Sequence, residues 1–386
     1  MTTLVENLIV IISKLIKFIS NTFNLGSGYT WPGHVALLVN PNFLKSRRIR
    51  FKKGVVLVSG TNGKTTTTKL ITHLLEKSGY TVSHNKSGAN LLNGIASSII
   101  LDFPAFGDLN RDFGVFEVDE GALPLVLSNL KASAVVLLNL SRDQLDRYGE
   151  VDIISEKWTK SLLSLNPAPT LIVDGDKDYF NSISQAFKGD TIAFGDSVDY
   201  LSRTKLHGLF NASNVNAAVS VVRFFGLKEG DFVSNLDSFE FAYGRGEVIK
   251  HGGKEFRVLL AKNPASFEHN LDLLLSEEAS EYNLFFALND KIPDGRDVSW
   301  IYDISAEKLR EACASKVVYV SGTRYLDMAV RLSYAGVNIS KENIFENLQH
   351  AVKEITLHGV SEKVICLPNY SSMLELRKIL TGKKIL

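Results

Sequence analysis

Short apolar runs rich in β-branched residues alternate with amphipathic stretches along most of the chain. The runs that predict strands are residues 55–58, 81–84, 113–118, 134–139, 171–173, 191–194, 257–260, 284–288, 317–320 and 364–367. Between them, stretches such as residues 211–225 place apolar side chains at helical spacing. Strands that alternate with helices are typical of a mostly parallel sheet, so the pattern predicts an α/β protein.

A polar stretch between about residues 228 and 246 separates two such alternating regions. A chain of 386 residues also exceeds what one hydrophobic core usually serves. We expect an N-terminal helix and connector at residues 1–50, a central domain at 51–240 and a smaller domain at 241–386.

The first helix candidate, residues 4–23, is strongly apolar. Glu6, Lys14 and Lys17 interrupt it, and its longest uninterrupted apolar run, Leu8–Ile12, is far below the ~20 residues of a membrane span. No small-residue cleavage site follows, which argues against a secretory signal. We favour a helix on the protein's own surface, with a helix lying in the lipid headgroup region as the alternative. Residues 26–37 contain three glycines and a proline and are expected to form an irregular connector.

Composition excludes several classes of function. The formal net charge of +1 gives no electrostatic case for binding nucleic acid. Two cysteines, Cys313 and Cys366, cannot supply a disulfide framework or a four-thiolate zinc site. Both lie in apolar surroundings, so we expect buried structural thiols and not nucleophiles.

A glycine turn joins the strand at residues 55–58 to the following helix. It consists of Gly60, Thr61, Asn62, Gly63, Lys64, Thr65 and Thr66. Glycines let backbone N–H groups approach phosphate oxygens, and a helix N-terminus attracts the same anion. The lysine suits the β/γ-phosphates and the Thr65 hydroxyl suits Mg²⁺. The alternative is a plain glycine-rich turn before a core helix. Val58 stands where the general P-loop pattern has its first glycine, which leaves the compact GTNGKT form found in Mur ligases and folylpolyglutamate synthetases.

Three carboxylates, Glu117, Asp119 and Glu120, end the strand at residues 113–118. A P-loop enzyme needs an acid at a strand end to hold magnesium opposite the P-loop hydroxyl. We choose Glu120 for this role; the alternative is a solvated acidic loop.

Several further segments carry a resemblance. They are FEVDE, NLSRDQLDRYGE, HGLFNASNVNAA, YGRGE, AKNPASF, NDKIPDGRDVSW and SGTRYLDMAVRLSYAG. With the P-loop, they resemble the Mur-ligase-type subunits of lipid II isoglutaminyl synthase, from about residue 24 to the C-terminus. In that family an ATP-dependent ligase forms a heterodimer with a glutaminase, whose ammonia amidates the D-glutamate α-carboxylate of the lipid II stem peptide in peptidoglycan synthesis. The resemblance implies a Mur-ligase-type central domain, a Rossmann-like C-terminal domain, ATP and Mg²⁺ as cofactors, and a cytoplasmic location, with contact at the inner membrane face as an open alternative.

The resemblance also implies roles for individual residues. Lys64 and Thr65 would serve phosphate and magnesium, with Glu120 on the metal. The other matches are Asn211 and Asn214 facing adenine, Arg245 reaching the γ-phosphate, and Asp176 near the ribose. Asn211 as a helix N-cap is an alternative compatible with the adenine role. Gln144 stands where many Mur ligases have a metal-binding histidine. Lys157 lies near the carbamylated lysine of some Mur ligases, but a surface helical lysine is the favoured interpretation.

Two expectations concern this family's distinctive features. Its members usually carry a four-cysteine zinc ribbon before the HG.FN segment, whereas residues 194–206 contain no cysteine, so we predict no zinc. An aspartate from residues 289–300 is thought to complete the partner glutaminase's Cys–His pair. We assign it to Asp297, with Asp294 as second candidate and an ion pair with Arg296 or loop capping as the alternative.

Two other functions remain open on the sequence. A self-sufficient ligase of the Mur or folylpolyglutamate type would add an amino acid without a partner. A P-loop protein that uses ATP only as a switch would bind ATP without forming an acyl phosphate.

Overall fold

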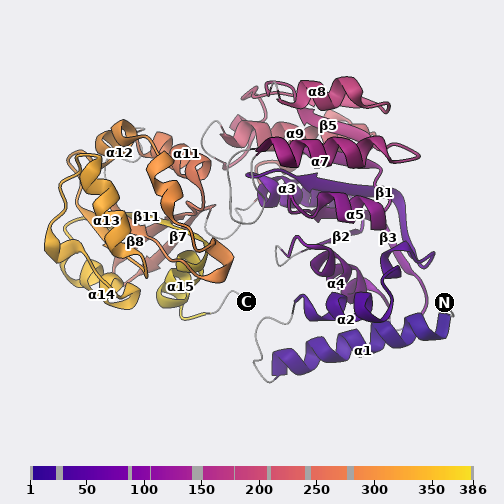
Figure 1. The fold of residues 1–386 in the computed structure, drawn as a ribbon, viewed down its shortest axis with the longest axis horizontal. Helices are drawn as coiled ribbons and strands as arrows, with labels where there is room; N and C mark the ends of the chain where they lie inside the picture. Colours follow the sequence, from indigo (N-terminus) through magenta and orange to yellow (C-terminus); the bar gives the residue numbers. More distant parts are fainter. Residues whose placement is uncertain are drawn as a thin grey trace. The chain divides into compact units, whose positions relative to one another are not determined.

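The computed structural model describes residues 3–22, 29–85, 89–104, 106–140, 151–177, 179–206, 210–239, 245–275 and 282–383. The described residues up to 239 form one compact unit and those from 245 onward form a second (Figure 1).

The first unit is built on a six-stranded sheet in the order β2-β3-β1-β4-β5-β6. Its strands are β1 Ile49–Ser59, β2 Val82–His84, β3 Leu109–Glu117, β4 Ala134–Leu137, β5 Thr170–Asp174 and β6 Thr191–Phe194. Every neighbouring pair is parallel, which confirms the predicted α/β class with a parallel sheet. The β-branched run Val55–Val58 lies in central strand β1 and is at most 4% exposed. Such a run is apolar because helices cover both faces of the strand.

Helices connect these strands. They are α3 Lys64–Lys77, α4 Leu92–Asp102, α5 Leu123–Asn129, α7 Val151–Leu163, α8 Tyr179–Ala186, α9 Phe210–Phe224 and α10 Glu229–Phe232, with 3₁₀ turns η1 Phe43–Lys45, η2 Leu201–Arg203 and η3 Val233–Asn235. The predicted helix at residues 211–225 corresponds to α9 within one residue at each end.

The expectation of an irregular connector at residues 26–37 is wrong for its second half. After α1 (Thr3–Thr22), helix α2 spans Trp31–Val39. Pro32 falls in the first turn, where its missing N–H costs nothing. Gly33 serves packing: a Cβ there would lie 1.9 Å from the carbonyl oxygen of Asn93, and its N–H donates to Ser97 Oγ at 2.7 Å. The glycine lets α2 approach α4 closely. In the sequence alone, glycine and proline indicate only where a regular element ends, so this packing role could not be predicted.

The second unit holds a five-stranded sheet in the order β10-β9-β11-β8-β7. Its strands are β7 Arg245–His251, β8 Lys254–Leu259, β9 Asn283–Ala287, β10 Val318–Ser321 and β11 Lys363–Pro368. Four are mutually parallel, and β7 pairs antiparallel with β8. The sequence pattern missed β7, most of which follows the polar stretch assigned to the boundary.

Helices of the second unit are α11 Pro264–Leu274, α12 Ala306–Cys313, α13 Tyr325–Tyr334, α14 Leu348–His358 and α15 Tyr370–Thr381, with 3₁₀ turns η5 Ile292–Asp294, η6 Ser299–Asp303 and η7 Lys341–Asn343. Strand β9 divides the core: Leu284 and Phe286 belong to one buried cluster, and Phe285 and Ala287 to the other. This is the period of two expected of a strand covered on both faces.

Both cysteines lie in the cores of the second unit, as expected for structural thiols. Burial raises the pKa of the Cys313 thiol to about 12 and also raises the pKa of Cys366. Because the thiolate is the nucleophile, neither side chain is suited to attack a carbonyl at neutral pH.

Candidate functional site

The turn between β1 and α3 is held from the side by Asn139, which follows strand β4. The Thr61 N–H donates to the Asn139 carbonyl oxygen at 2.9 Å, and the Asn62 N–H donates to Asn139 Oδ1 at 2.8 Å. In return Asn139 Nδ2 donates to the Asn62 carbonyl at 3.0 Å. The sequence analysis did not identify this asparagine as a site residue. The available signal was its position at the end of the strand predicted at residues 134–139.

Helix α3 begins at Lys64, immediately after Gly63 in the left-handed conformation (φ 84°). The first intrahelical bond runs from the Thr67 N–H to the Gly63 carbonyl at 2.9 Å. The N–H groups ahead of Thr67 therefore lie at the positive end of the helix dipole, an arrangement that favours a bound phosphate.

Lys64 and Glu120 form a buried ion pair within this loop. Their Nζ and Oε2 atoms are 2.9 Å apart, and the residues are 6% and 3% exposed. Lys64 Nζ also donates to the carbonyls of Gly60 and Thr61. Trp158 of α7 donates its indole N–H to the Glu120 carbonyl at 2.8 Å. A solvated acidic loop therefore does not describe Glu120.

The other two acids of this strand end have different environments. Glu117 is 6% exposed and accepts a long hydrogen bond of 3.5 Å from Asn90 Nδ2. Asn85 exchanges two hydrogen bonds with the Glu117 backbone. Asp119 caps its own turn by accepting the Gly121 N–H at 3.0 Å. Glu120, which pairs with the P-loop lysine, is the acid best placed for phosphate chemistry.

The residues present fit a magnesium nucleotide. Glu120 and Thr65 offer hard oxygen donors, and Lys64 offers the cation that a phosphate requires. Within the described ranges, no group of three or more His, Cys, Asp or Glu side chains gathers to hold a metal. Magnesium usually takes one or two ligands from the protein and the rest from phosphate oxygens and water.

Helix α9 packs its first turns against the P-loop. Asn214 accepts a hydrogen bond from Thr67 Oγ1 at 3.3 Å and donates to Asn211 Oδ1 at 3.1 Å. A Cβ added to Gly63 would lie 2.0 Å from Asn214 Oδ1. Asn214 therefore supports the back of the phosphate loop, in addition to the adenine contact that the sequence resemblance implies.

A buried carboxyl that the sequence did not single out lies at the end of β5. Asp174 is 1% exposed, and its burial raises its pKa. Ser213 of α9 donates to its Oδ2 at 3.1 Å, and the Asp176 N–H donates to its Oδ1 at 3.1 Å. Asp176, the predicted ribose contact, is itself exposed and accepts the Asp196 N–H at 3.0 Å.

The remaining predicted residues are described unevenly. Lys157 is exposed on α7, in keeping with a surface helical lysine. Arg245 is described by its backbone, as the first residue of β7, opposite Leu259. Gln144 lies outside the described residues.

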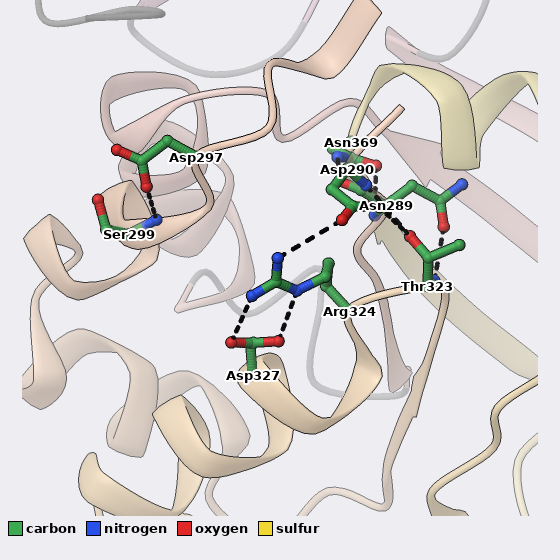
Figure 2. A network of polar contacts seen from close by, with 8 residues as sticks. All are labelled: Asn289, Asp290, Asp297, Ser299, Thr323, Arg324, Asp327 and Asn369. Atoms are coloured by element: carbon green, nitrogen blue, oxygen red, sulfur yellow. Dashed lines mark hydrogen bonds and ion pairs between the residues drawn. The ribbon is translucent and has the colours of Figure 1, made fainter. Parts of the chain in front are cut away.

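A second polar cluster lies where parallel strands β9, β10 and β11 end (Figure 2). Asn289 accepts the Thr323 N–H at 2.9 Å through its Oδ1. Its backbone N–H donates to Asn369 Oδ1 at 3.1 Å, and Asn369 Nδ2 returns a 2.6 Å bond to the Asn289 carbonyl. Both asparagines are at most 3% exposed, so they fasten the three strand ends together. The carboxyl edge of an open α/β sheet is the usual place for a ligand.

Arg324 is the cation of this cluster. It makes a two-pronged contact with Asp327, at 2.7 and 2.9 Å, and lies 3.5 Å from Asp290. Hydrogen bonding to Arg324 lowers the pKa of Asp327, and hydrogen bonding to Thr323 lowers that of Asp290. Both acids are ionised at neutral pH.

The two aspartates proposed to serve a partner differ in environment. Asp294 accepts the Ser371 N–H at 2.8 Å and the Ser371 hydroxyl, and burial raises its pKa. Asp297 is exposed, and its Oδ1 accepts the Ser299 N–H at 2.8 Å, which lowers its pKa (Figure 2). Asp297 therefore presents an ionised carboxylate to solvent, while Asp294 is engaged within its own unit.

Comparison with known protein families gives two matches. Residues 58–202 match the Mur ligase middle domain, and residues 260–373 match the MurT ligase C-terminal domain.

Two of the similar proteins carry the same name. The subunit MurT of lipid II isoglutaminyl synthase (glutamine-hydrolyzing) from Staphylococcus aureus strain COL is 29% identical over 90% of this chain and 91% of its own. The protein of that name from Streptococcus pneumoniae R6 is 27% identical over 94% of each.

Among solved structures, the MurF ligase from Thermotoga maritima in complex with ADP is similar in fold. Its TM-score is 0.67 at 17% identity, over 90% of this chain and 84% of that one. At this identity the likeness concerns the fold alone, and it agrees with the predicted Mur-ligase-type architecture.

Proposed function

We propose that the chain is a MurT-type Mur ligase and acts as the ATP-dependent ligase subunit of a lipid II isoglutaminyl synthase. It would convert the α-carboxylate of D-glutamate in the lipid II stem peptide to an amide, giving D-isoglutamine. The observation that carries the proposal is the match to MurT proteins over nine-tenths of both chains. The P-loop geometry supports it independently.

Amide formation from a carboxylate and ammonia is uphill in water, so the acid must first gain a better leaving group. In the proposed reaction the carboxylate attacks the γ-phosphorus of ATP, which releases ADP and gives an acyl phosphate. Ammonia then attacks the acyl carbon and displaces inorganic phosphate. Lys64 and the first-turn N–H groups of α3 would stabilise charge on the transferred phosphoryl group, with Arg245 as a further cation. Bound Mg²⁺ would neutralise phosphate charge, held by Glu120 and Thr65. No zinc takes part in this proposal.

Ammonia would come from a separate glutaminase in a heterodimer. Cys313 and Cys366 are buried thiols with raised pKa values, so neither supplies the nucleophile of a glutaminase. The exposed, ionised Asp297 would orient the partner's catalytic histidine, as the third member of a shared triad. A reaction that uses ATP and a lipid-linked precursor would take place in the cytoplasm, at the inner face of the membrane.

The test uses the full chain alone, MgATP and a lipid II analogue with a short, soluble prenyl chain. We expect phosphate release and an amidated product with ammonium chloride, and neither with glutamine until a glutaminase is added. Hydroxylamine in place of ammonium should trap the acyl phosphate as a hydroxamate.

The other functions give different results in the same assay. A product extended by an amino acid would assign a self-sufficient ligase. ATP binding without phosphate release or hydroxamate, in the presence of the analogue and ammonium, would assign a nucleotide switch.

A further inference from the structure

Helix α1 is the outermost layer of the first unit. Figure 1 shows α2 and α4 between α1 and the sheet, and α1 packs on both of these helices. One face of α1 is therefore covered by protein.

The uncovered face of α1 is apolar throughout. The exposed side chains between residues 4 and 19 are Leu4, Leu8, Ile11, Ile12, Leu15, Phe18 and Ile19, between 40% and 78% exposed. We call these seven residues the α1 apolar face. No exposed polar side chain interrupts this face over residues 4–19, all of which the structure describes.

The polar side chains between residues 4 and 20 contact the protein instead. Glu6 accepts a hydrogen bond from Ser46 Oγ at 3.0 Å and pairs with Arg48 at 3.7 Å. Lys14 donates to the Phe103 carbonyl, and Lys17 lies over the Tyr29 ring, 3.2 Å from its centroid.

Serines complete this inward polar set, since Ser13 and Ser20 are buried at 0% and 6% exposure. A surface helix in water has the opposite arrangement, with its apolar stripe inward. Ile9 and Val10 of α1 are buried as well, but the exposed side of the helix carries apolar side chains where a helix in water carries polar ones, so folding of this unit leaves the α1 apolar face uncovered.

Helix α2, which follows α1 in the sequence and packs against it, also exposes apolar side chains. Trp31, Leu38 and Val39 are 53%, 75% and 54% exposed. Tryptophan and tyrosine, the latter present as Tyr29 beside Lys17, favour the boundary between headgroups and acyl chains.

Charge identifies the occupant of this face. Residues 1–53 contain eight lysines and arginines and a single acidic residue, a net charge of +7 in a chain whose total is +1. Arg48, Arg50 and Lys52 pair with Asp108 and Asp112 elsewhere in the unit, so the excess is carried by the other cations. Among these, exposed Lys45 ends η1 and exposed Arg47 lies just beyond it; Ser46 between them donates a hydrogen bond to Glu6 of α1. A second copy of this chain would bring two such positive segments together, whereas an anionic bilayer would be attracted to one.

We propose that the α1 apolar face inserts in the interfacial region of an anionic lipid bilayer and holds the enzyme on the membrane surface. Helix α1 would lie parallel to the membrane, with its apolar face toward the acyl chains. No described helix is long and apolar enough to cross a bilayer, so the attachment is peripheral. The inference deepens the proposed function, and it rests on that proposal only for the lipid-borne nature of the substrate.

Vesicle flotation of the full chain tests the proposal, with phosphatidylcholine vesicles that contain or lack phosphatidylglycerol. We expect the protein to float with the anionic vesicles and much less with neutral ones. The variant Leu8→Gln/Ile12→Gln substitutes two exposed positions with a good helix former. It should bind anionic vesicles at least tenfold more weakly.

A matched control comes from the second unit. Leu326 and Val330 on α13 are also a leucine and a β-branched residue four positions apart, with 59% and 46% exposure, close to the 55% and 41% of Leu8 and Ile12. Leu326→Gln/Val330→Gln should float like the unchanged protein. Circular dichroism melts compare the folding of all three proteins.

Three outcomes would overturn the proposal. One is failure of the unchanged protein to bind anionic vesicles. Another is equal binding by the α1 variant. The third is a dimer in analytical ultracentrifugation that Leu8→Gln/Ile12→Gln makes monomeric while vesicle binding is absent, which would assign the α1 apolar face to a second copy. Amidation of the soluble analogue does not depend on vesicles, so a failure here leaves the proposed function standing.

Discussion

At the scale of single residues, the Lys64–Glu120 pair carries the clearest prediction. Lys64→Ala and Glu120→Ala should each abolish ATP turnover, because each removes a group proposed to act on phosphate or metal. Because both residues are buried, losing one partner should also destabilise the first unit by about 3–5 kcal/mol. The sequence gave no indication of this pairing.

A double variant separates the two effects. Lys64→Met/Glu120→Gln removes both charges, so thermal or urea unfolding should show most of the lost stability restored. Phosphate release should remain absent. Normal turnover in any of these variants would reject the P-loop assignment.

Asp297→Asn should lower glutamine hydrolysis by the assembled complex by as much as about ten-thousandfold, the order seen in kcat when a catalytic histidine loses its orienting acid. Asparagine keeps the oxygen that accepts the Ser299 N–H, so the loop should retain its conformation. The value of kcat should fall while KM for glutamine changes little, and amidation driven by ammonium chloride should be unaffected.

Asp303, another exposed aspartate six residues further on, gives the matched control Asp303→Asn, which should retain activity. Unchanged glutaminase activity in an assembled Asp297→Asn complex would exclude the shared triad. Loss of assembly would make Asp297 an interface residue instead.

At the scale of elements, the turn from β1 into α3 depends on how closely α9 approaches. Gly63 and Gly79 have nearly the same positive φ angle, 84° and 88°. A Cβ at Gly63 would overlap Asn214 Oδ1 at 2.0 Å, whereas a Cβ at Gly79 meets nothing within 4 Å. Gly79→Ala should cost only the conformational strain, about 1–2 kcal/mol.

Gly63→Ala should cost more in thermal unfolding and should weaken ATP binding at least tenfold in calorimetric titration. The comparison of the two variants isolates the Asn214 contact from the strain of a left-handed residue. Equal effects on stability and on ATP affinity would show that the approach of α9 does not shape the loop.

At the scale of the whole molecule, the expectation of magnesium dependence without zinc can be tested by metal analysis. Its two cysteines are buried in the second unit, and residues 195–206 lead from β6 through η2 without a cysteine. We predict well below one zinc per purified chain by elemental analysis. EDTA should stop ATP turnover without lowering the melting temperature, and added magnesium should restore turnover. One tightly bound zinc per chain would contradict this.

Signals within a few neighbouring residues determined the α/β class, ten of the strands and the phosphate loop. Strand periodicity, glycine turns and helical spacing are properties of neighbouring residues. A contiguous segment such as Gly60–Thr66 is therefore enough to recognise such a feature. Strand β7 was missed because its polar, glycine-containing start resembles a linker. Helix α2 was missed because glycine reads as a breaker unless the closeness of α4 is known.

The tertiary structure alone decided which distant residues complete each site. Asn214 contacts Thr67, 147 positions away in the sequence, and Asn369 contacts Asn289, 80 positions away. The order of the parallel strands brings together the carboxyl ends of strands that are distant in sequence, and with them the helices that begin there. The sequence likewise showed that α1 is apolar, but not which side of it faces outward. Most positions around this helix carry apolar side chains, so its orientation was fixed only by the partners of Glu6 and Lys14 and by the burial of Ser13 and Ser20.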